Sequence, residues 1–281
     1  MIWQTPHRTF DFTRTGAVMG VLNVTPDSFS DGGQWLDLDA AIAHAEEMLA
    51  EGAEIIDVGG ESTRPGASPV DEATEKSRVL PVIERLAALP GHGCRFVISL
   101  DTMKPAVARD GAAAGAAIIN DVGGLRDERM LDVIKQTGAA AVVMHMRGEP
   151  KTMQDSPVYA DVVNDVREFF CAALARCIDC GVPADRIAFD PGFGFGKTPQ
   201  HNTELLRRLP ALAVASRPIV VGVSRKSFIG RLLGTQSIGD RAWPTVALTS
   251  FCRERGARVV RVHEVKPNLE ALRMTEAIIA P

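Results

Sequence analysis

The chain has 281 residues, enough for one large domain or two small ones. Its hydrophobic content of 46% and charged content of 23% are ordinary for a soluble globular protein. A formal net charge of −4 argues against a nucleic-acid-binding protein, which usually has a basic excess. It leaves open a local basic pocket for an anionic small molecule.

The sequence has no feature of an exported or membrane protein. Residues 1–14 are polar, contain Pro6 and lack the apolar stretch of a secretory signal. No apolar run approaches the ~20 residues that a membrane-spanning helix needs. The five cysteines are odd in number and lack framework spacing, so we expect a reduced, cytoplasmic protein. Cys177 and Cys180 have no second metal-like pair, and we interpret them as a buried helix face.

Short apolar runs, each closed by polar residues, recur along the chain, and each has the length of a buried strand. They lie at 17–22, 54–56, 96–100, 116–119, 140–143, 187–189, 219–223 and 258–260. Helices are expected between them, at 39–51, 68–89, from 105, and at 127–137, 160–180, 201–209, 226–233, 240–255 and 267–279. Ser68 is the expected N-cap of the second helix, with Pro69 at its first position. Gly-Ala precedes four strands, at 52–53, 115–116, 138–139 and 256–257, where glycine suits a left-handed C-cap.

Alternation of strand and helix, repeated eight times, predicts an α/β fold with parallel strands. We expect a single-domain (β/α)8 TIM barrel over residues 17–281, with a doubly wound open sheet as the alternative. The barrel explains more, because the ends of all eight strands then converge on one mouth. Residues 1–16, with Trp3, Phe10 and Phe12, are expected to cover the bottom of the barrel.

Polar residues follow the strands and are therefore expected together at the mouth. They are Asn23, Asp57, Asp101, Asn120, Asp190, Lys226, Arg261 and His263, with Arg64 on a loop. A lone polar strand end is more often a helix cap or turn residue, but so many together indicate a binding or catalytic mouth. Carboxylates and amides suit a flat heterocycle with N–H donors, and the cationic groups suit a phosphate. A ligand with a nitrogen heterocycle at one end and a phosphate at the other would bind both kinds of side chain.

Two glycine-rich strings are close to nucleotide-binding motifs without matching them. The string GFGFG at 192–196 has the wrong spacing for a dinucleotide fingerprint and follows Pro191. The string GVSRKS at 222–227 lacks the glycine that precedes the lysine of a P-loop. We therefore do not favour a nucleotide-binding interpretation of either string.

Five strings resemble the dihydropteroate synthase family of the folate pathway, in its bacterial type. They are NVTPDSFSDG at 23–32, DVGGESTRPG at 57–66, DPGFGFGK at 190–197, SRKS at 224–227 and RVH at 261–263. The resemblance covers about residues 18–279, and the motifs occur in family order. It implies a β/α barrel, a cytoplasmic homodimer and a sulfonamide target. The string DRAWPT at 240–245 departs from the family pattern, which puts the local helix entry and a subunit contact in doubt.

The resemblance implies a transferase that joins 6-hydroxymethyl-7,8-dihydropterin diphosphate to p-aminobenzoate, with Mg²⁺ as cofactor. The implied products are 7,8-dihydropteroate and diphosphate. The charges involved suggest dissociative substitution with electrostatic stabilisation as the main contribution. One alternative is a pterin-dependent methyltransferase, which would need a methyl-acceptor partner. The other is a non-catalytic pterin-binding paralogue. Such a protein would be expected to have lost the motifs of the loops at 25–33 and 59–66, whereas both are intact in this sequence.

The family resemblance also implies site residues, which are listed here by ligand. The pterin is assigned to Asp101, Asn120, Met144, Asp190, Gly222, Lys226 and Arg261. The diphosphate is assigned to Asn23, Arg64, Arg261 and His263, with Mg²⁺ on Asn23. The p-aminobenzoate is assigned to Phe29, Thr63, Arg64, Pro65, Phe195, Lys226 and Ser227. Catalytic roles are implied for Asp101, Lys226, Arg261 and His263.

Overall fold

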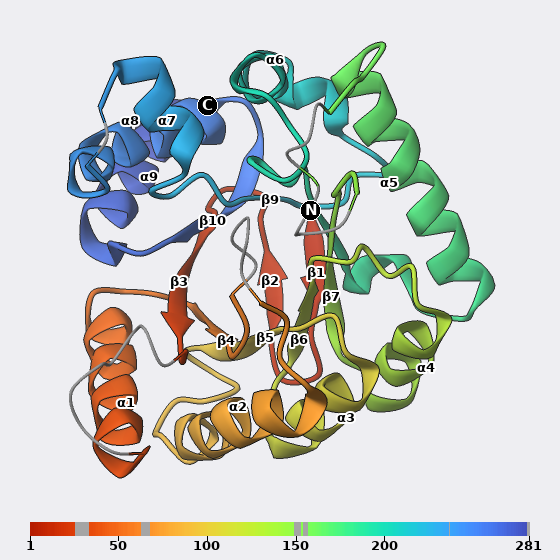
Figure 1. Cartoon of the computed structure of the whole chain (residues 1–281), viewed down its shortest axis with the longest axis vertical. Helices are drawn as coiled ribbons and strands as arrows, with labels where there is room; N and C mark the ends of the chain where they lie inside the picture. Colours follow the sequence, from red (N-terminus) through yellow and green to blue (C-terminus); the bar gives the residue numbers. More distant parts are fainter. Residues whose placement is uncertain (26–33, 63–67, 149–152, 154–156, 236, 280–281) are drawn as a thin grey trace.

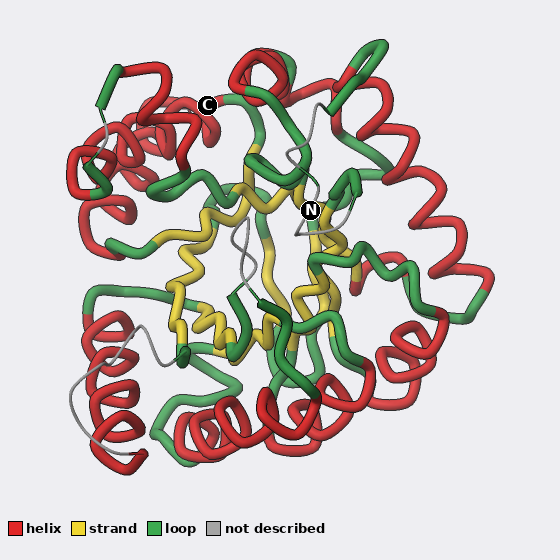
Figure 2. The backbone as a smooth tube through the Cα atoms, viewed as in Figure 1, coloured by secondary structure: helices red, strands yellow, loops and turns green. Residues whose placement is uncertain are grey.

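The computed structural model describes residues 1–25, 34–62, 68–148, 153, 157–235 and 237–279. Parallel strands close into a barrel in the order β10-β3-β4-β5-β6-β7-β8-β9, which is the yellow ring of Figure 2. Their bounds are β3 Ala17–Asn23, β4 Ile55–Gly59, β5 Val97–Asp101, β6 Ile118–Asp121, β7 Ala140–Met144, β8 Ile187–Asp190, β9 Ile219–Val221 and β10 Ala257–Val262. The register pairs Val259 of β10 with Ala17 of β3, so the sheet has closed on itself. The predicted barrel is confirmed, and the open-sheet alternative is wrong.

Helices connect the strands and surround the barrel (Figure 1). They are α1 Gln34–Ala50, α2 Glu72–Ala87, α3 Pro105–Ala114, α4 Glu128–Thr137, α5 Val162–Asp179, α6 Pro199–Arg207, α7 Ser227–Leu233, α8 Ala242–Glu254 and α9 Val265–Ile279. Short 3-10 helices lie at η2 Ala184–Arg186, η3 Leu209–Leu212 and η4 Gly239–Arg241. In the described part of the chain, every helix is too short or too polar to span a membrane.

Two local predictions about the helices are wrong. The N-cap of α2 is Asp71, whose side chain accepts from the Thr74 N–H at 2.7 Å. The Val70 N–H, which Ser68 would bind as an N-cap, donates instead to Glu61 Oε1 at 3.1 Å. The second error concerns the cysteine pair of α5, because Cys177 is buried but Cys180 is exposed at the helix end.

The four Gly-Ala joints are confirmed as left-handed turns between a helix and the next strand. The φ angles of Gly52, Gly115, Gly138 and Gly256 are 103°, 126°, 73° and 99°. A residue with a Cβ rarely adopts such angles, so glycine suits the end of each of these helices.

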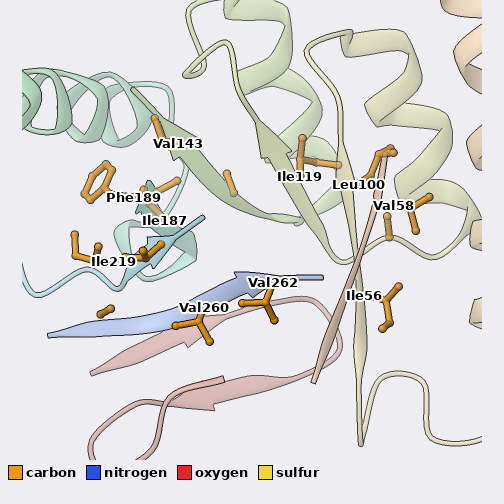
Figure 3. Close-up of a cluster of buried hydrophobic side chains, with 14 of the residues drawn as sticks. Ile56, Val58, Leu100, Ile119, Val143, Ile187, Phe189, Ile219, Val260 and Val262 are labelled. Carbon is orange, nitrogen blue, oxygen red and sulfur yellow. The ribbon is translucent and has the colours of Figure 1, made fainter. Parts of the chain in front are cut away.

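Alternation along each strand sorts the side chains into an outer and an inner set. In β4, Ile56 and Val58 belong to the cluster between barrel and helices, whereas Ile55 belongs to the cluster inside the barrel. Figure 3 shows the outer cluster, which also includes Leu100 of β5 and Val143 of β7. Near the carboxyl ends of the strands, inward positions are occupied by polar residues, such as Asp57 of β4.

The chain begins with an antiparallel hairpin, β1 Ile2–Gln4 and β2 Thr9–Asp11, before the first barrel strand. Its rings Trp3, Phe10 and Phe12 are buried with the inward side chains of the barrel strands, such as Met19 and Val259. The Trp3 Nε1–H donates to the Arg186 carbonyl at 3.0 Å, which satisfies the buried indole. The inner cluster therefore includes side chains from residues 1–16.

A buried ion pair joins the last two helices of the chain to the start of the first barrel strand. Arg253 of α8 and Glu276 of α9 are 3% and 6% exposed, with Arg253 Nε 2.8 Å from Glu276 Oε1. The same carboxylate accepts from the backbone N–H of Gly16, at the entry to β3, and from Arg273 at 2.7 Å. Arg253 also donates to the Arg14 carbonyl at 2.9 Å. These bonds fix the last two helices against the first barrel strand.

Replacing Glu276 by glutamine should destabilise the fold, because Arg253 then stays buried without its counterion. Loss of one partner of a buried pair typically costs about 3–5 kcal/mol. Urea unfolding followed by circular dichroism measures the change in unfolding free energy. The matched control is Glu254→Gln, whose side chain is 61% exposed and pairs with Arg255 at the surface, so that its effect should stay below about 1 kcal/mol. Equal effects of the two substitutions would contradict this role of the buried pair.

Candidate active site

Arg261 lies at the centre of the mouth, held by the carboxylates of Asp57, which is fully buried, and Asp101, which is partly exposed. It is an inward residue of β10, and its Nε is 2.6 Å from Asp57 Oδ2. Its Nη2 is 2.9 Å from Asp101 Oδ2, which extends from the end of β5. Burial lowers the pKa of Arg261, but the two carboxylates raise it by more, so the guanidinium stays charged. The mouth therefore contains a fixed cation in contact with two acidic groups.

Asp57 accepts more hydrogen bonds than Asp101, although sequence reasoning assigned it only a place at the mouth. Besides Arg261, it accepts from Ser99 Oγ at 2.6 Å and from Asn120 Nδ2 at 3.1 Å. Its side chain is fully buried on β4. Its contacts therefore orient both Arg261 and Asn120, two residues predicted for the pterin site. The available sequence signal was its inward position two residues before the Gly59-Gly60 turn.

Asp101 is a carboxylate whose pKa lies close to neutral pH. Burial raises its pKa to about 7, with Arg261 acting in the opposite direction and Asp57 adding to the increase. Its side chain is 12% exposed, so it faces the opening of the barrel. The ionised form of Asp101 is therefore lost as the pH falls through about 7.

A second charged group consists of Asp190, at the end of β8, and Lys226, which precedes α7. Asp190 Oδ1 accepts from the Gly192 N–H at 2.7 Å, and burial raises the pKa of this carboxyl. Lys226 Nζ donates to the Phe193 carbonyl and lies 4.5 Å from the centre of the Phe195 ring. Burial lowers the pKa of Lys226 to about 8, although Asp190 acts in the opposite direction.

Gly222 keeps open the space between these two charged groups. A Cβ added at this position would lie 3.6 Å from Asp190 Oδ2 and 3.9 Å from the Arg261 side chain. A larger side chain would extend into the space between the Asp190 carboxylate and Arg261. Glycine at this position therefore leaves the inner surface of the mouth accessible to a flat ligand.

His263 lies just after β10 and contacts Ser224, which follows β9. Its Nδ1 is 2.9 Å from Ser224 Oγ, and that oxygen also accepts from the His263 backbone N–H at 3.3 Å. When Ser224 donates to Nδ1, the proton of a neutral ring is on Nε2, which makes this nitrogen a donor. Ser224 is therefore a site residue that sequence reasoning did not assign.

Asn23 ends β3 on the inner side, paired with Gly59 at the carboxyl end of β4, and Gly59 in turn pairs with Asp101 of β5. A Cβ added at Gly59 would lie 3.6 Å from both Asn23 Oδ1 and the Asp101 Cβ, so glycine separates these two side chains. Within the described ranges, no three or more His, Cys, Asp or Glu side chains are arranged to hold a metal ion. Asn23 therefore offers a single amide oxygen and not a preformed cage.

An apolar wall completes the mouth. It is formed by Val122, Met144, Met146 and Met153, with Met103 and Phe195 packed against them. Methionine side chains are flexible and polarisable, which suits a surface that packs against a flat ring. Met144 and Phe195 were predicted for different ligands, and the structure places both in this wall.

The structure thus brings together Asp101, Asn120, Met144, Asp190, Gly222, Lys226 and Arg261, with Asn23, His263 and Phe195 nearby on adjacent strands or loops. Ser227 is the first residue of α7 and is exposed beside Lys226. The predicted residues Phe29, Thr63, Arg64 and Pro65 lie outside the described residues.

Comparison with known proteins gives one consistent result. The model of a family described as pterin binding enzyme matches residues 19–263. The dihydropteroate synthase of Escherichia coli strain K12 is 46% identical over 265 residues, covering 94% of this chain and 92% of that protein. The enzyme of Neisseria meningitidis serogroup B is 45% identical over 267 residues, covering 93% and 92%.

Solved structures agree with the sequence relatives. Yersinia pestis dihydropteroate synthase in a sulfonamide drug complex superposes with a TM-score of 0.92 at 43% identity over the full length of both chains. Burkholderia cenocepacia dihydropteroate synthase complexed with 7,8-dihydropteroate gives 0.88 at 42% identity, covering 99% of this chain and 96% of that one. The Xanthomonas albilineans enzyme with 4-aminobenzoic acid gives 0.89 at 42% identity, covering 98% and 96%. The chain belongs to the pterin-binding enzymes and, among them, to the dihydropteroate synthase family.

Proposed function

We propose that this chain condenses 6-hydroxymethyl-7,8-dihydropterin diphosphate with p-aminobenzoate to give 7,8-dihydropteroate and diphosphate. The observation that carries the proposal is the meeting, in one mouth, of the Asp57–Arg261–Asp101 network and the Asp190–Lys226 group. Carboxylates and amides bind the N–H groups of a pterin, while Arg261 and His263 bind an anion. Related dihydropteroate synthase structures in complex with 7,8-dihydropteroate and with 4-aminobenzoic acid support this choice of product and substrate.

In the proposed reaction, the bond between the methylene carbon and the diphosphate oxygen breaks first, and its electron pair leaves with the diphosphate. Arg261 and His263 stabilise the negative charge that develops on the leaving group. Positive charge develops on the methylene carbon and the pterin ring. Ionised Asp101 stabilises this cation, with Asp57 holding Arg261 in place beside it.

The second half of the reaction forms the C–N bond. The aryl amine of p-aminobenzoate is neutral at pH 7, so its lone pair attacks the cation without a strong base. The nitrogen then releases a proton to solvent. Asn120, Asp190 and Lys226 hold the heterocycle, and the Met144 wall packs against its face. Phe195 and Ser227, with the undescribed Phe29, Thr63, Arg64 and Pro65, are proposed for the p-aminobenzoate side.

Mg²⁺ is part of this proposal. The donor set at Asn23 fits this ion, because Mg²⁺ binds through one or two protein oxygens together with substrate phosphates. Asn23 and the substrate diphosphate would hold it. Bound there, the ion would neutralise part of the charge on the leaving group.

A homodimer in the cytoplasm is also part of the proposal. Exposed apolar side chains occur on α7, α8 and α9, which lie close together in Figure 1, and at Ile238 just before η4. They include Leu233 at 59%, Trp243 at 78% and Ile278 at 70% exposure. Apolar surface gathered in this way is typical of protein–protein contacts. Trp243 lies in the string that departs from the family pattern, so it is a direct probe of the contact.

Diphosphate release tests the reaction and its order of steps. The purified protein is mixed with the dihydropterin diphosphate and Mg²⁺, with and without p-aminobenzoate. We expect turnover only with p-aminobenzoate, and a single-turnover burst of diphosphate without it, because the leaving group departs before the amine attacks. Turnover without any such burst would contradict the dissociative order. Pterin binding with no release under either condition would indicate a non-catalytic pterin-binding protein.

The dependence of kcat/KM on pH should be bell-shaped, because the reaction needs Asp101 ionised and Lys226 charged. The rate should rise with pH through about 7 and fall above about 8, following the two pKa values. In Asp101→Asn, kcat/KM should fall by about 10²–10³ and the Asp101 limb should disappear. An acid limb that survives unchanged in this variant would belong to the substrate diphosphate and would contradict the role given to Asp101.

Trp243→Asp tests the dimer. A charge placed in an apolar contact must be desolvated, so we expect the variant to sediment as a monomer at concentrations where the unchanged chain is a dimer. Sedimentation velocity measures the mass of both. Val158→Asp is the control, because Val158 is 72% exposed on the loop before α5 and lies outside α7, η4, α8 and α9. A dimer that survives Trp243→Asp would place the contact elsewhere.

A further inference from the structure

Lys197 is a buried lysine that the proposed reaction does not use. It is 2% exposed, and its Nζ has four acceptors within hydrogen-bond distance. These are the carbonyl oxygens of Gly192 and Phe195, both at 3.0 Å, with the carbonyl and Nδ1 of His145 at 3.2 and 3.0 Å. The three carbonyls are uncharged, and the His145 ring is uncharged as well, because burial lowers its pKa to about 2. Such a costly burial of an amino group requires a structural explanation.

The loop at 192–196 is folded around this amino group. Gly192, Gly194 and Gly196 all have positive φ angles, of 65°, 81° and 59°, which turns successive carbonyls in different directions. A Cβ on Gly192 would lie 1.9 Å from the His145 carbonyl oxygen, and one on Gly196 would lie 2.4 Å from the Arg147 carbonyl oxygen. The loop is therefore packed directly against the backbone that follows β7, with Lys197 Nζ bonded to both sides.

The same loop contacts the charged groups of the mouth. Its Phe193 carbonyl accepts from Lys226, its Phe195 ring lies 4.5 Å from Lys226 Nζ, and its Gly192 N–H donates to Asp190. The loop thus lies between two amino groups. Lys197 donates to the carbonyls of Gly192 and Phe195, and Lys226 donates to the Phe193 carbonyl, which lies between them in the sequence.

We propose that Lys197 is a positioning residue that sets the place of Lys226. By drawing two loop carbonyls toward the end of β7, it turns the Phe193 carbonyl and the Phe195 ring toward Lys226. Removal of Lys197 leaves those carbonyls without their donor and allows the loop to relax, so that Lys226 loses its fixed partners. The kinetic consequence rests on the proposed function, whereas the position of Lys226 does not.

Lysine NMR measures this position without any substrate. The chain has seven lysines, so ¹³Cε-lysine labelling gives few signals, and Lys226→Arg identifies the one from Lys226. In Lys197→Met, which has similar length and no donors, the Lys226 signal should move. The Lys104 signal should stay, because Lys104 Nζ pairs with Glu61 and, at 2.5 Å, with Glu75 of α2, and both partners lie outside the loop at 192–196. Lys266→Met, the same change at an exposed lysine, should leave both signals in place.

Enzyme kinetics give the second measurement, made at a temperature at which circular dichroism shows each variant to be folded. In Lys197→Met, kcat/KM for the dihydropterin diphosphate should fall on the order of 10²-fold, as expected for a misplaced binding group. It should stay unchanged in Lys266→Met. An inactive unsubstituted chain would overturn the proposed function, while the NMR comparison would still decide the role of Lys197.

Several results would overturn the proposal. One is an unchanged Lys226 signal in folded Lys197→Met, and another is an equal displacement of the Lys104 and Lys226 signals. If Lys197→Met does not fold, Lys197→Gln repeats the comparison, since its amide keeps two donors, and the Lys226 signal should then move less far. Failure of both variants to fold would also overturn the proposal, because Lys197 would then be required for the fold as a whole.

Discussion

The ion network of Asp57, Arg261 and Asp101 is the interaction on which the mouth depends. Two carboxylates and one guanidinium, when all are ionised, have a net charge of −1 inside a barrel where charges are weakly screened. Burial opposes this charge, and the cost appears as the raised pKa of Asp101. A cation developing next to Asp101 would relieve it. The proposed reaction creates such a cation on the pterin methylene, so the ground-state cost of the network becomes an advantage in the transition state.

The network exists because the barrel fixes both the direction and the level of each side chain. Neighbouring strands pair Asp57 with Ser99 and Gly59 with Asp101, which places polar inward residues of β4 and β5 next to one another. The alternate residues Ile56 and Val58 remain under the helices. A shift of one residue in this register would exchange the two sets and bury the carboxylates against apolar helix faces. The outer core therefore fixes the geometry of the site as firmly as the ion pairs do.

Much of this arrangement could be predicted from sequence, and the failures have physical causes. The short apolar runs indicated all eight strands. The polar residues that follow them indicated the mouth, because strand ends converge in such a barrel. The role of Asp57 could not be predicted, since its partners Ser99, Asn120 and Arg261 come from three other strands and depend on register. The cap at Ser68 was predicted from local sequence alone, whereas Glu61, farther back in the chain, binds the Val70 N–H that this cap would bind.

Buried cations in this mouth are stabilised in two different ways, and the difference matches their proposed tasks. Arg261 is paired with carboxylates, which raise its pKa and keep it charged while negative charge develops on the departing diphosphate. Lys197 and Lys226 instead donate to carbonyl oxygens, and the pKa of each is lowered. Carbonyls orient an amino group without neutralising it, so Lys226 keeps a free charge for the ligand. A loop with three glycines at positive φ is what allows its carbonyls to turn toward two lysines at once, so that both amino groups are oriented by neutral acceptors.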